Sequence, residues 1–482
     1  MRRTACLMVI GMVVCSLGVA AAQQGSAPRS VPPLTRGELF YGLYCWASDL
    51  SREDSLRLVK ETGFKFISTM VNEGQEEDIL LAARNGLTCA GILGANAYAR
   101  TMDRDAWRTS VTQAVERFGP GGSLWKENPG VPAAPIKYWI IWGEPGTAMK
   151  PAGDMMPDEA YAELLKVAYE EIKAHGEDLI VVAMSPIGTY ASRPSPDYVD
   201  EERKVMGTYA FIRGVHEHGG YPYYDCIDIH PFSFPMPSDT AGLARMIQWL
   251  KDEMRKYGEE KPIWFTEIGF ALSYGPAKPF HVTKDQAADY MVRCLALSAR
   301  HSVQSLNITY VLDQISGRTG LYKAYGYYGG AKTRPIAVAT KQMIDLIPEP
   351  ELLEVISDGE NVGDRAYRSS DRPYEDSPFF CYEFRGREGS EVFAVWTEGR
   401  PFIYRLKVPR DKMVLYNREI IGGLVYSKEN GSISAEGEMT IPVSGVPLFI
   451  STAVTPKQEA ATMRYLKPAE VSDWTPIEGR ED

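Results

Sequence analysis

The sequence predicts an α/β fold: a (β/α)8 TIM barrel followed by a smaller all-β, sandwich-like C-terminal domain. The first observation is that apolar strand runs alternate with amphipathic helical stretches, in eight repeats, from Leu39 to Leu346. The second is that these runs are apolar on both faces, which is typical of parallel strands covered by helices. The third is a change to short strand runs separated by turn signals after Pro348.

Eight apolar runs are the expected barrel strands, and helical stretches lie between them. The strands are Phe40–Trp46, Phe64–Val71, Leu87–Leu93, Ile136–Trp142, Leu179–Ser185, Cys226–Pro231, Ile263–Glu267 and Leu306–Leu312. The helices include Ser51–Thr62, Asp158–His175, Thr240–Tyr257 and Lys284–Ser302. An open, doubly wound sheet is the alternative, and it usually carries a Gly-rich phosphate turn after its first strand. The corresponding turn, Cys45–Asp49, contains no glycine, which favours the barrel.

Six further strand runs predict the C-terminal β-domain, most simply a small sandwich packed beside the barrel. They are Phe379–Phe384, Val392–Trp396, Ile403–Val408, Met413–Tyr416, Gly422–Tyr426 and Pro447–Thr452. The expected organisation is a signal peptide at 1–22, a linker at 23–37, the barrel at 38–347, the β-domain at 348–456 and a tail at 457–482.

The N-terminus has the pattern of an export signal. Basic Arg2 and Arg3 precede the apolar stretch Leu7–Val19 and the small residues Ala20–Ala22. The apolar stretch is too short to span a bilayer comfortably, and no other segment approaches the ~20 residues required. We therefore expect a secreted or periplasmic protein, cleaved after Ala22 and not inserted in a membrane. The net charge of −11 argues against nucleic acid and anionic membranes as partners.

Five cysteines remain once the signal is removed: Cys45, Cys89, Cys226, Cys294 and Cys381. An odd number without clustered spacing is no disulfide framework, and no pair has the spacing of zinc ligands. All except Cys294 lie in apolar strand runs, so buried free thiols are expected.

Two lone glutamates end apolar strand runs and carry the main functional signal. Glu144 follows the fourth run, in Ile140–Pro145, and Glu267 ends the seventh, in Ile263–Gly269. Burying a carboxylate is costly, so a strand end is an unusual place for one unless the site needs it. Because barrel enzymes place their chemistry at the carboxyl ends of the strands, the two side chains are expected to meet there.

Strand alternation predicts that both glutamates face the barrel axis. In the fourth strand Glu144 shares a face with Ile140 and Trp142, and in the seventh Glu267 shares a face with Ile263 and Phe265. With both pointing inward, the carboxylates would sit at the ~5 Å separation that suits a retaining glycosidase.

The two motifs resemble those of glycoside hydrolase clan A, the retaining (β/α)8-barrel glycosidases, and the C-terminal β-domain is similar to that of family 39-like members. In that clan the acid/base follows the fourth strand in a Trp-Asn-Glu-Pro-like motif, and the nucleophile ends the seventh strand. The resemblance spans the whole barrel and implies that Glu144 is the acid/base and Glu267 the nucleophile. It also implies a β-linked oligo- or polysaccharide substrate, cleaved through a glycosyl-enzyme intermediate without a cofactor.

One position departs from the clan pattern. The clan places an asparagine before the acid/base, where it hydrogen-bonds the sugar 2-hydroxyl, and this chain has Gly143 instead. Losing one such charge-stabilising bond costs a few kcal/mol of transition-state binding, on the order of 3 kcal/mol. Gly143 therefore puts ordinary substrate choice and full catalytic power in doubt.

Five other residues are candidates for substrate binding at the barrel mouth. Trp46, at the end of the first strand, either stacks on a sugar or fills the core. His230, at the end of the sixth, either hydrogen-bonds the sugar or the nucleophile, or is a structural histidine. Tyr310 and Asp313, ending the eighth strand, stand where the clan commonly has a sugar-stacking tryptophan. Asn96, after the third strand, is a polar candidate that ordinary loop packing also explains.

The expected function is a retaining glycoside hydrolase, and two alternatives stay open. One is a catalytically weakened carbohydrate-binding barrel, because of Gly143. The other is a lyase or isomerase that uses Glu144 and Glu267 for proton transfer, although that chemistry usually recruits a lysine or a metal. The six histidines are scattered along the sequence, so no metal site is expected, and the oligomeric state is left open.

Overall fold

The computed structural model describes residues 31–45, 53–71, 74–94, 103–145, 156–187, 199–200, 205–231, 240–270, 282–309, 328–329, 332–359, 378–399, 401–420 and 422–454. The expected signal peptide and the expected tail lie outside these residues.

The eight predicted strands close into a parallel barrel, which confirms the expected fold class. They are β1 (Tyr41–Tyr44), β2 (Phe66–Met70), β3 (Thr88–Leu93), β4 (Tyr138–Ile141), β5 (Ile180–Ile187), β8 (Cys226–His230), β9 (Ile263–Ile268) and β10 (Ser305–Thr309). Their order around the barrel is β1-β10-β9-β8-β5-β4-β3-β2. Because β1 pairs in parallel with both β2 and β10, the sheet is closed, and the doubly wound alternative is excluded.

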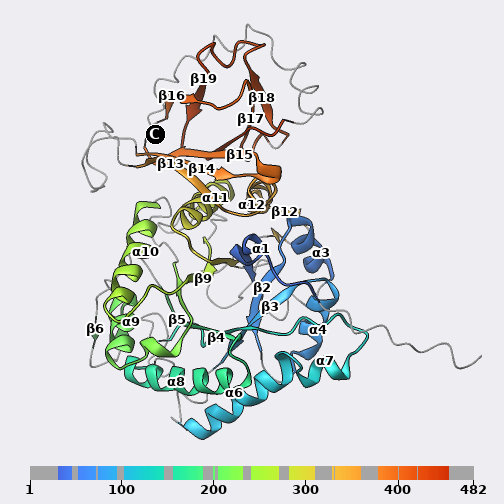
Figure 1. The fold of residues 1–482 in the computed structure, drawn as a ribbon, viewed down its shortest axis with the longest axis vertical. Helices are drawn as coiled ribbons and strands as arrows, with labels where there is room; N and C mark the ends of the chain where they lie inside the picture. The colour runs from blue at the N-terminus through green and yellow to red at the C-terminus, as the bar shows by residue number, and fades with distance from the viewer. Residues whose placement is uncertain are drawn as a thin grey trace, which may run out of the picture.

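A ring of helices surrounds the barrel (Figure 1). The described helices are α1 (Arg36–Phe40), α3 (Glu53–Thr62), α4 (Glu76–Arg84), α6 (Arg104–Phe118), α7 (Ser123–Glu127), α8 (Asp158–His175), α9 (Thr208–Glu217), α10 (Thr240–Arg255), α11 (Lys284–Arg300) and α12 (Pro335–Leu346). Local sequence fixes several starts. Thr283 and Gln286 form a capping box at the start of α11, and the Asp103 side chain accepts two backbone amides at the start of α6.

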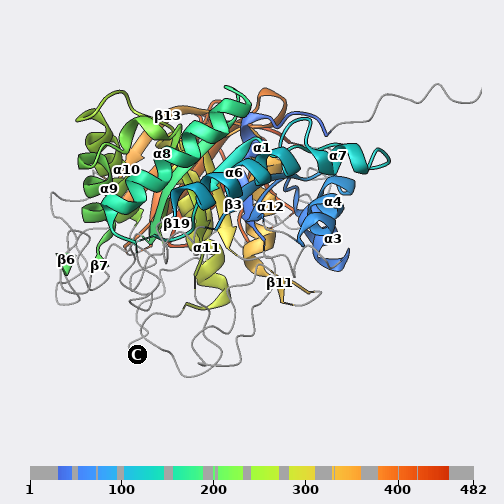
Figure 2. The ribbon, with the colours of Figure 1, turned by 90° about the horizontal axis from the view of Figure 1, so that it is seen from below.

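Two short hairpins were not predicted. They are β6 (Val199–Asp200) with β7 (Val205–Met206), and β11 (Tyr328–Gly329) with β12 (Lys332–Thr333). The first follows the carboxyl end of β5 and the second that of β10, and Figure 2 shows β6, β7 and β11 at the same edge of the barrel. Both therefore belong to loops on the side where the candidate residues lie.

Large side chains pack the barrel interior. Phe66, Tyr138 and Trp264 meet there with ring centroids 5.4 to 5.8 Å apart. Asn307 of β10 crosses the interior and donates to the Ser68 hydroxyl at 2.9 Å. This crossing is possible because β1 carries a glycine, Gly42, opposite Asn307. A Cβ on Gly42 would lie 1.6 Å from Asn307 Oδ1.

The C-terminal domain is all-β, as expected. Its strands are β13 (Leu352–Asp358), β14 (Phe379–Arg385), β15 (Glu391–Thr397), β16 (Phe402–Lys407), β17 (Lys412–Tyr416), β18 (Leu424–Ser427), β19 (Glu438–Val443) and β20 (Leu448–Ser451). Six of them form one sheet in the order β13-β14-β15-β20-β17-β18, and β16 pairs with β19 in a second sheet. The structure adds β13 and β19 to the six predicted strands.

The large sheet of the β-domain is buried on both faces. Cys381 and Val395 pack in a cluster with Ile441 of β19, between the two sheets. Tyr382 and Trp396, on the opposite face, belong to the core cluster that includes the barrel helices. The β-domain sheet is therefore continuous with the hydrophobic core of the barrel.

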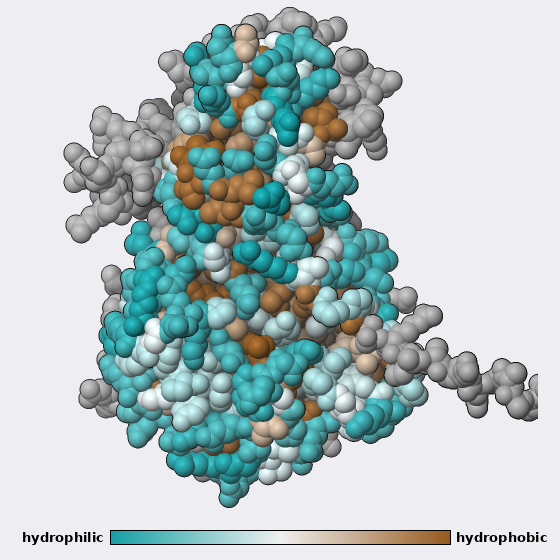
Figure 3. Space-filling model, viewed as in Figure 1, coloured by the Kyte–Doolittle hydropathy of each residue, from teal (hydrophilic) through white to brown (hydrophobic). Residues whose placement is uncertain are grey.

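Charged side chains join the β-domain to α11. Arg418 Nε lies 3.0 Å from Asp289 Oδ1, and Arg300 Nη2 lies 3.1 Å from Asp358 Oδ2. Figure 1 shows the domain seated over α11 and α12. The face seen in Figure 3 is mostly hydrophilic over the barrel, and apolar residues gather on the β-domain around β13 and β14, where Leu353 is 38% exposed.

All five cysteines of the described chain are buried free thiols, as predicted, including Cys294 in α11. Within the described residues, no helix has both the length and the apolar character needed to cross a bilayer.

Candidate active site

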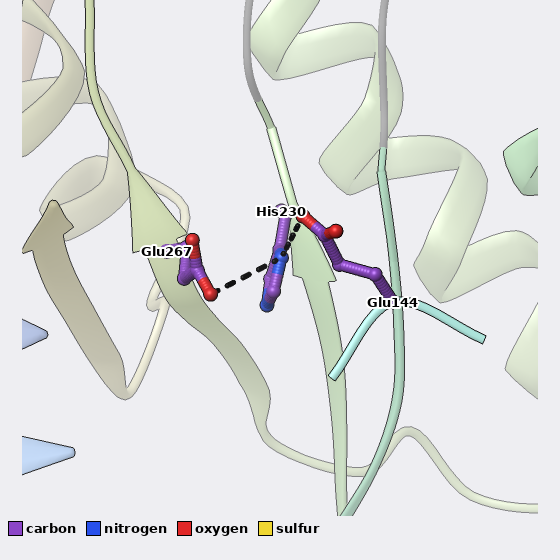
Figure 4. A group of neighbouring side chains, drawn as sticks. All are labelled: Glu144, His230 and Glu267. Atoms are coloured by element: carbon purple, nitrogen blue, oxygen red, sulfur yellow. Dashed lines mark hydrogen bonds and ion pairs between the residues drawn. The ribbon is translucent and has the colours of Figure 1, made fainter. Parts of the chain in front are cut away.

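Three side chains meet at the carboxyl ends of barrel strands (Figure 4). Glu144 follows β4, His230 is the last residue of β8, and Glu267 is the last residue but one of β9. Because all eight strands run parallel, these positions open onto the same end of the barrel.

The His230 ring lies between the two carboxylates (Figure 4). Its Nδ1 is 3.2 Å from Glu144 Oε1 and 3.9 Å from Glu267 Oε1. This nitrogen and one oxygen from each glutamate all lie within 4.8 Å of one another. The His230 side chain is 2% exposed, whereas those of Glu144 and Glu267 are 23% and 12% exposed. The carboxylates therefore share a space that retains access to solvent, and the ring is buried between them.

Opposite charges hold His230 in its cationic form. Burial by itself lowers the pKa of the imidazole, but three carboxylates around it act in the other direction. The charge of Glu267, the hydrogen bond to Glu144 and the charge of Asp228 outweigh burial and raise the pKa of His230 to about 9. At neutral pH the site therefore contains a buried cation among acidic groups.

The backbone around Glu144 is strained, and its conformation sets the direction of the Glu144 side chain. Trp142 has φ 57° and Glu144 has φ 58°, in the left-handed region that non-glycine residues rarely adopt. The Glu144 amide donates to the Ser185 carbonyl of β5 at 3.1 Å, which fixes this turn. Trp142 packs in the core that includes the surrounding helices, so simple alternation does not describe the end of β4.

Gly143 lies between these two residues, outside the left-handed region. Among the described residues, a Cβ built on Gly143 would meet nothing within 4 Å. No described side chain or backbone atom therefore blocks a side chain at this position.

The register of β9 changes immediately before Glu267. Phe265 pairs with Leu306 and Ile268 pairs with Ile308, so β9 uses three residues where β10 uses two. The extra residue is a β-bulge, a feature that commonly redirects a side chain next to a functional site.

This bulge corrects the alternation argument for Glu267. Ile263 and Phe265 belong to the core shared with the helices, whereas Trp264 points into the barrel interior. Thr266 also faces inward and hydrogen-bonds Asp228. The prediction that Glu267 shares an inward face with Ile263 and Phe265 is therefore wrong, because the bulge brings Glu267 to the mouth.

A buried polar network lies beneath His230. The ring Nε2 is 2.9 Å from the Thr266 hydroxyl, which in turn donates to the carboxylate of Asp228. Asp228 also accepts from the Thr266 amide at 2.7 Å and from the Ser185 hydroxyl at 2.5 Å. Neither Thr266 nor Ser185 was predicted from the sequence to belong to the site. Thr266 stands beside a predicted nucleophile, and this adjacency is the signal that could have drawn attention to it.

The remaining predicted binding residues cannot be placed around this group. Trp46, Asn96, Tyr310 and Asp313 lie outside the described residues, so their roles stay predictions. Of the predicted site residues, Glu144, His230 and Glu267 are the three that the described chain brings together.

Glu144, His230 and Glu267 are also the group, among the described side chains, whose spacing could hold a metal ion. An ion there would have to displace the hydrogen that joins His230 Nδ1 to Glu144. The sequence-based expectation of a site without a metal stays a prediction.

No family model and no curated protein sequence matches this chain. The fold, however, matches solved structures. A β-xylosidase from Caulobacter crescentus CB15 matches with TM-score 0.50 and 15% identity, over 88% of this chain and 97% of that one. The GH39 enzyme from Xanthomonas axonopodis pv. citri gives 0.51 and 13%, over 90% and 99%. A family 51 α-L-arabinofuranosidase from Bifidobacterium longum gives 0.53 and 12%, over 88% and 96%. The fold of this chain is that of the clan A glycoside hydrolases, consistent with the family 39-like resemblance.

Proposed function

We propose that the chain is a secreted or periplasmic retaining β-glycoside hydrolase, with Glu267 as nucleophile and Glu144 as acid/base. The observation that carries the proposal is the pairing of two carboxylates from separate strands, with oxygens within 4.8 Å. Oxygens this close are compatible with the retaining class, whose carboxyl groups lie ~5–5.5 Å apart and act together on one anomeric carbon. The fold shared with known glycosidases supports a carbohydrate as the substrate.

The reaction would proceed by two displacements at the anomeric carbon. A Glu267 oxygen forms a bond to that carbon while the bond to the leaving oxygen breaks, and Glu144 transfers a proton to the departing oxygen. Water then attacks the glycosyl-enzyme, Glu144 takes the proton from the water, and the bond to Glu267 breaks. The configuration at the anomeric carbon is inverted twice and is therefore retained.

The two glutamates need different protonation states, and both contact the His230 ring. Glu267 must be ionised to attack, and the cationic ring of His230 at 3.9 Å favours its charged form. Glu144 has the more exposed side chain and hydrogen-bonds the same ring, so its proton can exchange with solvent between turnovers.

Replacing each glutamate separately tests the proposal. Glu267→Ala should reduce turnover of activated aryl β-glycosides by about 10⁴-fold or more, since the nucleophile is lost. Glu144→Ala should retain the first step on substrates with good leaving groups, and added azide should then yield a glycosyl azide of retained configuration. Glu354→Ala, on the exposed surface of β13, is the control and should behave as wild type. Full activity in Glu267→Ala would refute the assignment.

A carbohydrate-binding barrel without turnover is the second candidate, and Gly143 is the observation that favours it. The position lacks the side chain that the clan uses next to the acid/base, and no atom of the described residues fills its place within 4 Å of the Cβ position. Calorimetric binding across a glycan panel, followed by product analysis of the same mixtures, separates the two candidates. Binding without any released sugar would favour the second.

A further inference from the structure

The hydrogen bonds beneath His230 all lead, from donor to acceptor, to the carboxylate of Asp228. Asp228 and Thr266 are buried, and neither faces solvent. Oδ1 of Asp228 accepts from the Thr266 amide, and Oδ2 accepts from the Thr266 and Ser185 hydroxyls. Oγ1 of Thr266 also lies 2.9 Å from His230 Nε2.

A hydroxyl has a single hydrogen, so it cannot donate to two partners at once. The Thr266 hydroxyl gives its hydrogen to the Asp228 carboxylate, which as an ionised group can only accept. The Thr266 oxygen must therefore accept a hydrogen bond from His230. The hydrogen between Thr266 Oγ1 and His230 Nε2 is thus bonded to Nε2. This bond fixes one ring nitrogen of His230 as a donor.

Toward its described partners, the other ring nitrogen then has two acceptable arrangements. Nδ1 lies 3.2 Å from Glu144 Oε1 and faces Glu267 as well. A bare nitrogen lone pair against two carboxylates would be repulsive, so a hydrogen must lie between Nδ1 and Glu144. It resides either on Nδ1, with Glu144 ionised, or on Glu144, which then donates to Nδ1.

We infer that Asp228 is a positioning residue that acts through the Thr266 hydroxyl to keep the hydrogen on His230 Nε2, so that Nδ1 and Glu144 share one proton as a single acid. The tautomer follows from the hydrogen bonds alone, whereas its catalytic consequence rests on the proposed function.

The charged groups around the ring agree with this arrangement. Among the described residues, His230 faces Glu144 after β4, Glu267 on β9 and Asp228 on β8 itself. Burial holds the pKa of Asp228 above its ordinary value, and the His230 charge and the three hydrogen bonds from Ser185 and Thr266 oppose this shift and favour the ionised form. The pKa of His230 is about 9, so the shared proton is held at neutral pH.

Asp228 is also near one tyrosine. Tyr161 of α8 donates to the Ile141 carbonyl and accepts from the Met184 amide. Burial raises the pKa of Tyr161, so its hydroxyl remains neutral and adds no charge beside Asp228.

The proton balance fits both displacement steps. When Glu267 attacks, the shared proton passes from Nδ1 through Glu144 to the leaving oxygen. Glu267 becomes an ester and loses its negative charge, which is one of the charges that held the proton on the ring. The pair formed by Glu144 and His230 then lacks its proton, and this deficit makes Glu144 a stronger base toward the incoming water. Deprotonation of that water restores the shared proton.

Ring nitrogen NMR of protein labelled with ¹⁵N-histidine tests the inference, because two-bond correlations identify which nitrogen carries hydrogen. The chain has six histidines, and His230→Gln assigns the relevant signal. In the wild type, Nε2 should keep its hydrogen while Nδ1 loses its own only near pH 9.

Three variants separate the roles of the network. Thr266→Ser keeps the hydroxyl and should keep the wild-type tautomer. Thr266→Val removes it and should lower the His230 pKa by about one unit or more. Asp228→Asn can donate to the Thr266 oxygen, which reverses the hydrogen bond and should move the ring hydrogen to Nδ1. Ser185→Ala removes the other hydroxyl from Asp228 and should leave the His230 tautomer unchanged.

A neutral wild-type ring without hydrogen on Nε2, observed above pH 9, would overturn the inference, and so would an unchanged tautomer of the neutral ring and an unchanged pKa in both Thr266→Val and Asp228→Asn. The wild-type and Thr266→Ser spectra decide the matter even if the other variants do not fold. These spectra need no turnover. An inactive protein with the expected tautomers would therefore refute the proposed function and leave the positioning role standing. In an active enzyme, the alkaline limb of the pH profile should move to lower pH in Thr266→Val and return in Thr266→Ser.

Discussion

Replacing Gly143 by asparagine tests whether this position limits the enzyme. The described part of the chain can take the side chain, since a Cβ on Gly143 meets none of its atoms within 4 Å and the φ of Gly143 lies outside the left-handed region. The new amide would stand next to Glu144, where the clan uses it to bind the sugar 2-hydroxyl. We therefore expect Gly143→Asn to increase turnover without a loss of stability.

The size of the increase follows from two opposing terms. A hydrogen bond to developing charge in the transition state contributes about 2.7–4 kcal/mol. Ordering an exposed asparagine side chain costs roughly 1 kcal/mol. The difference of about 1.7–3 kcal/mol corresponds to an increase of roughly 18- to 160-fold in kcat/KM, at 1.36 kcal/mol for each factor of ten. Stability should change by less than about 0.5–1 kcal/mol, since no contact is lost and glycine is replaced at a position free of strain.

The assay is hydrolysis of a matched pair of aryl β-glycosides, one with and one without the 2-hydroxyl. Gly143→Asn should accelerate the first substrate and leave the second at the wild-type rate. Gly143→Ala is the control, because it changes the backbone in the same way and carries no amide. An equal increase with alanine, or an increase that persists on the 2-deoxy substrate, would show that the amide does not act as argued.

Four further outcomes are expected. The His230 cation should stabilise the fold fully below about pH 6.5, and this stabilisation, about 3 kcal/mol, should disappear as the pH rises through 9. Urea unfolding at pH 6 and pH 10 should therefore differ more for the wild type than for His230→Gln. Arg418→Ala should destabilise the protein by about 1–3 kcal/mol, because the Asp289 carboxylate loses its partner at 3.0 Å. Since burial raises the pKa of Asp289 to about 6, the penalty should be smaller at pH 5 than at pH 8, and equal melting shifts at both would contradict this. Dialysis against a chelator should leave hydrolysis unchanged, because the proposed mechanism uses only carboxylates and an imidazole. N-terminal sequencing of the exported protein should begin at Gln23, and an intact Met1 would rule out cleavage after Ala22.

The sequence predicted the barrel well because its strands carry a strong local signal. Each of the eight apolar runs overlaps one observed barrel strand, with ends within a few residues. In the β-domain, β13 and β19 were missed for an identifiable reason. Both are edge strands of their sheets, and each has exposed residues such as Glu354 and Glu438 that interrupt the apolar run.

The site was predicted only in part, because its geometry depends on departures from regular strands. Glu144 and Glu267 were found from their unusual positions at strand ends, and His230 from its place on the sixth strand. The bulge in β9 and the turn that brings the Ser185 carbonyl to Glu144 have no sequence signature of their own. Both arise from pairing between strands that are distant in the sequence, which local periodicity does not report.

Backbone strain gives evidence for this site that is independent of the family resemblance. Of the six described non-glycine residues with positive φ, four lie at the carboxyl ends of β4 and β5: Trp142, Glu144, Met184 and Ser185. Each such residue costs on the order of 1–3 kcal/mol, and strain of this kind persists only where the surrounding structure enforces it. Four of them at one edge of the barrel therefore mark a place where geometry is maintained at the expense of stability.

The contacts that enforce this strain also position the catalytic candidates. The Tyr161 hydroxyl donates to the Ile141 carbonyl at 2.8 Å and accepts from the Met184 amide at 2.9 Å, which ties the ends of β4 and β5 together. The Ser185 carbonyl then accepts the Glu144 amide, and its hydroxyl reaches Asp228 beneath the histidine. A regular β5 would place neither group there. The strained strand ends thus hold the backbone of Glu144 in place and support the His230 ring through Asp228. Relief of the strain would therefore disturb both residues together.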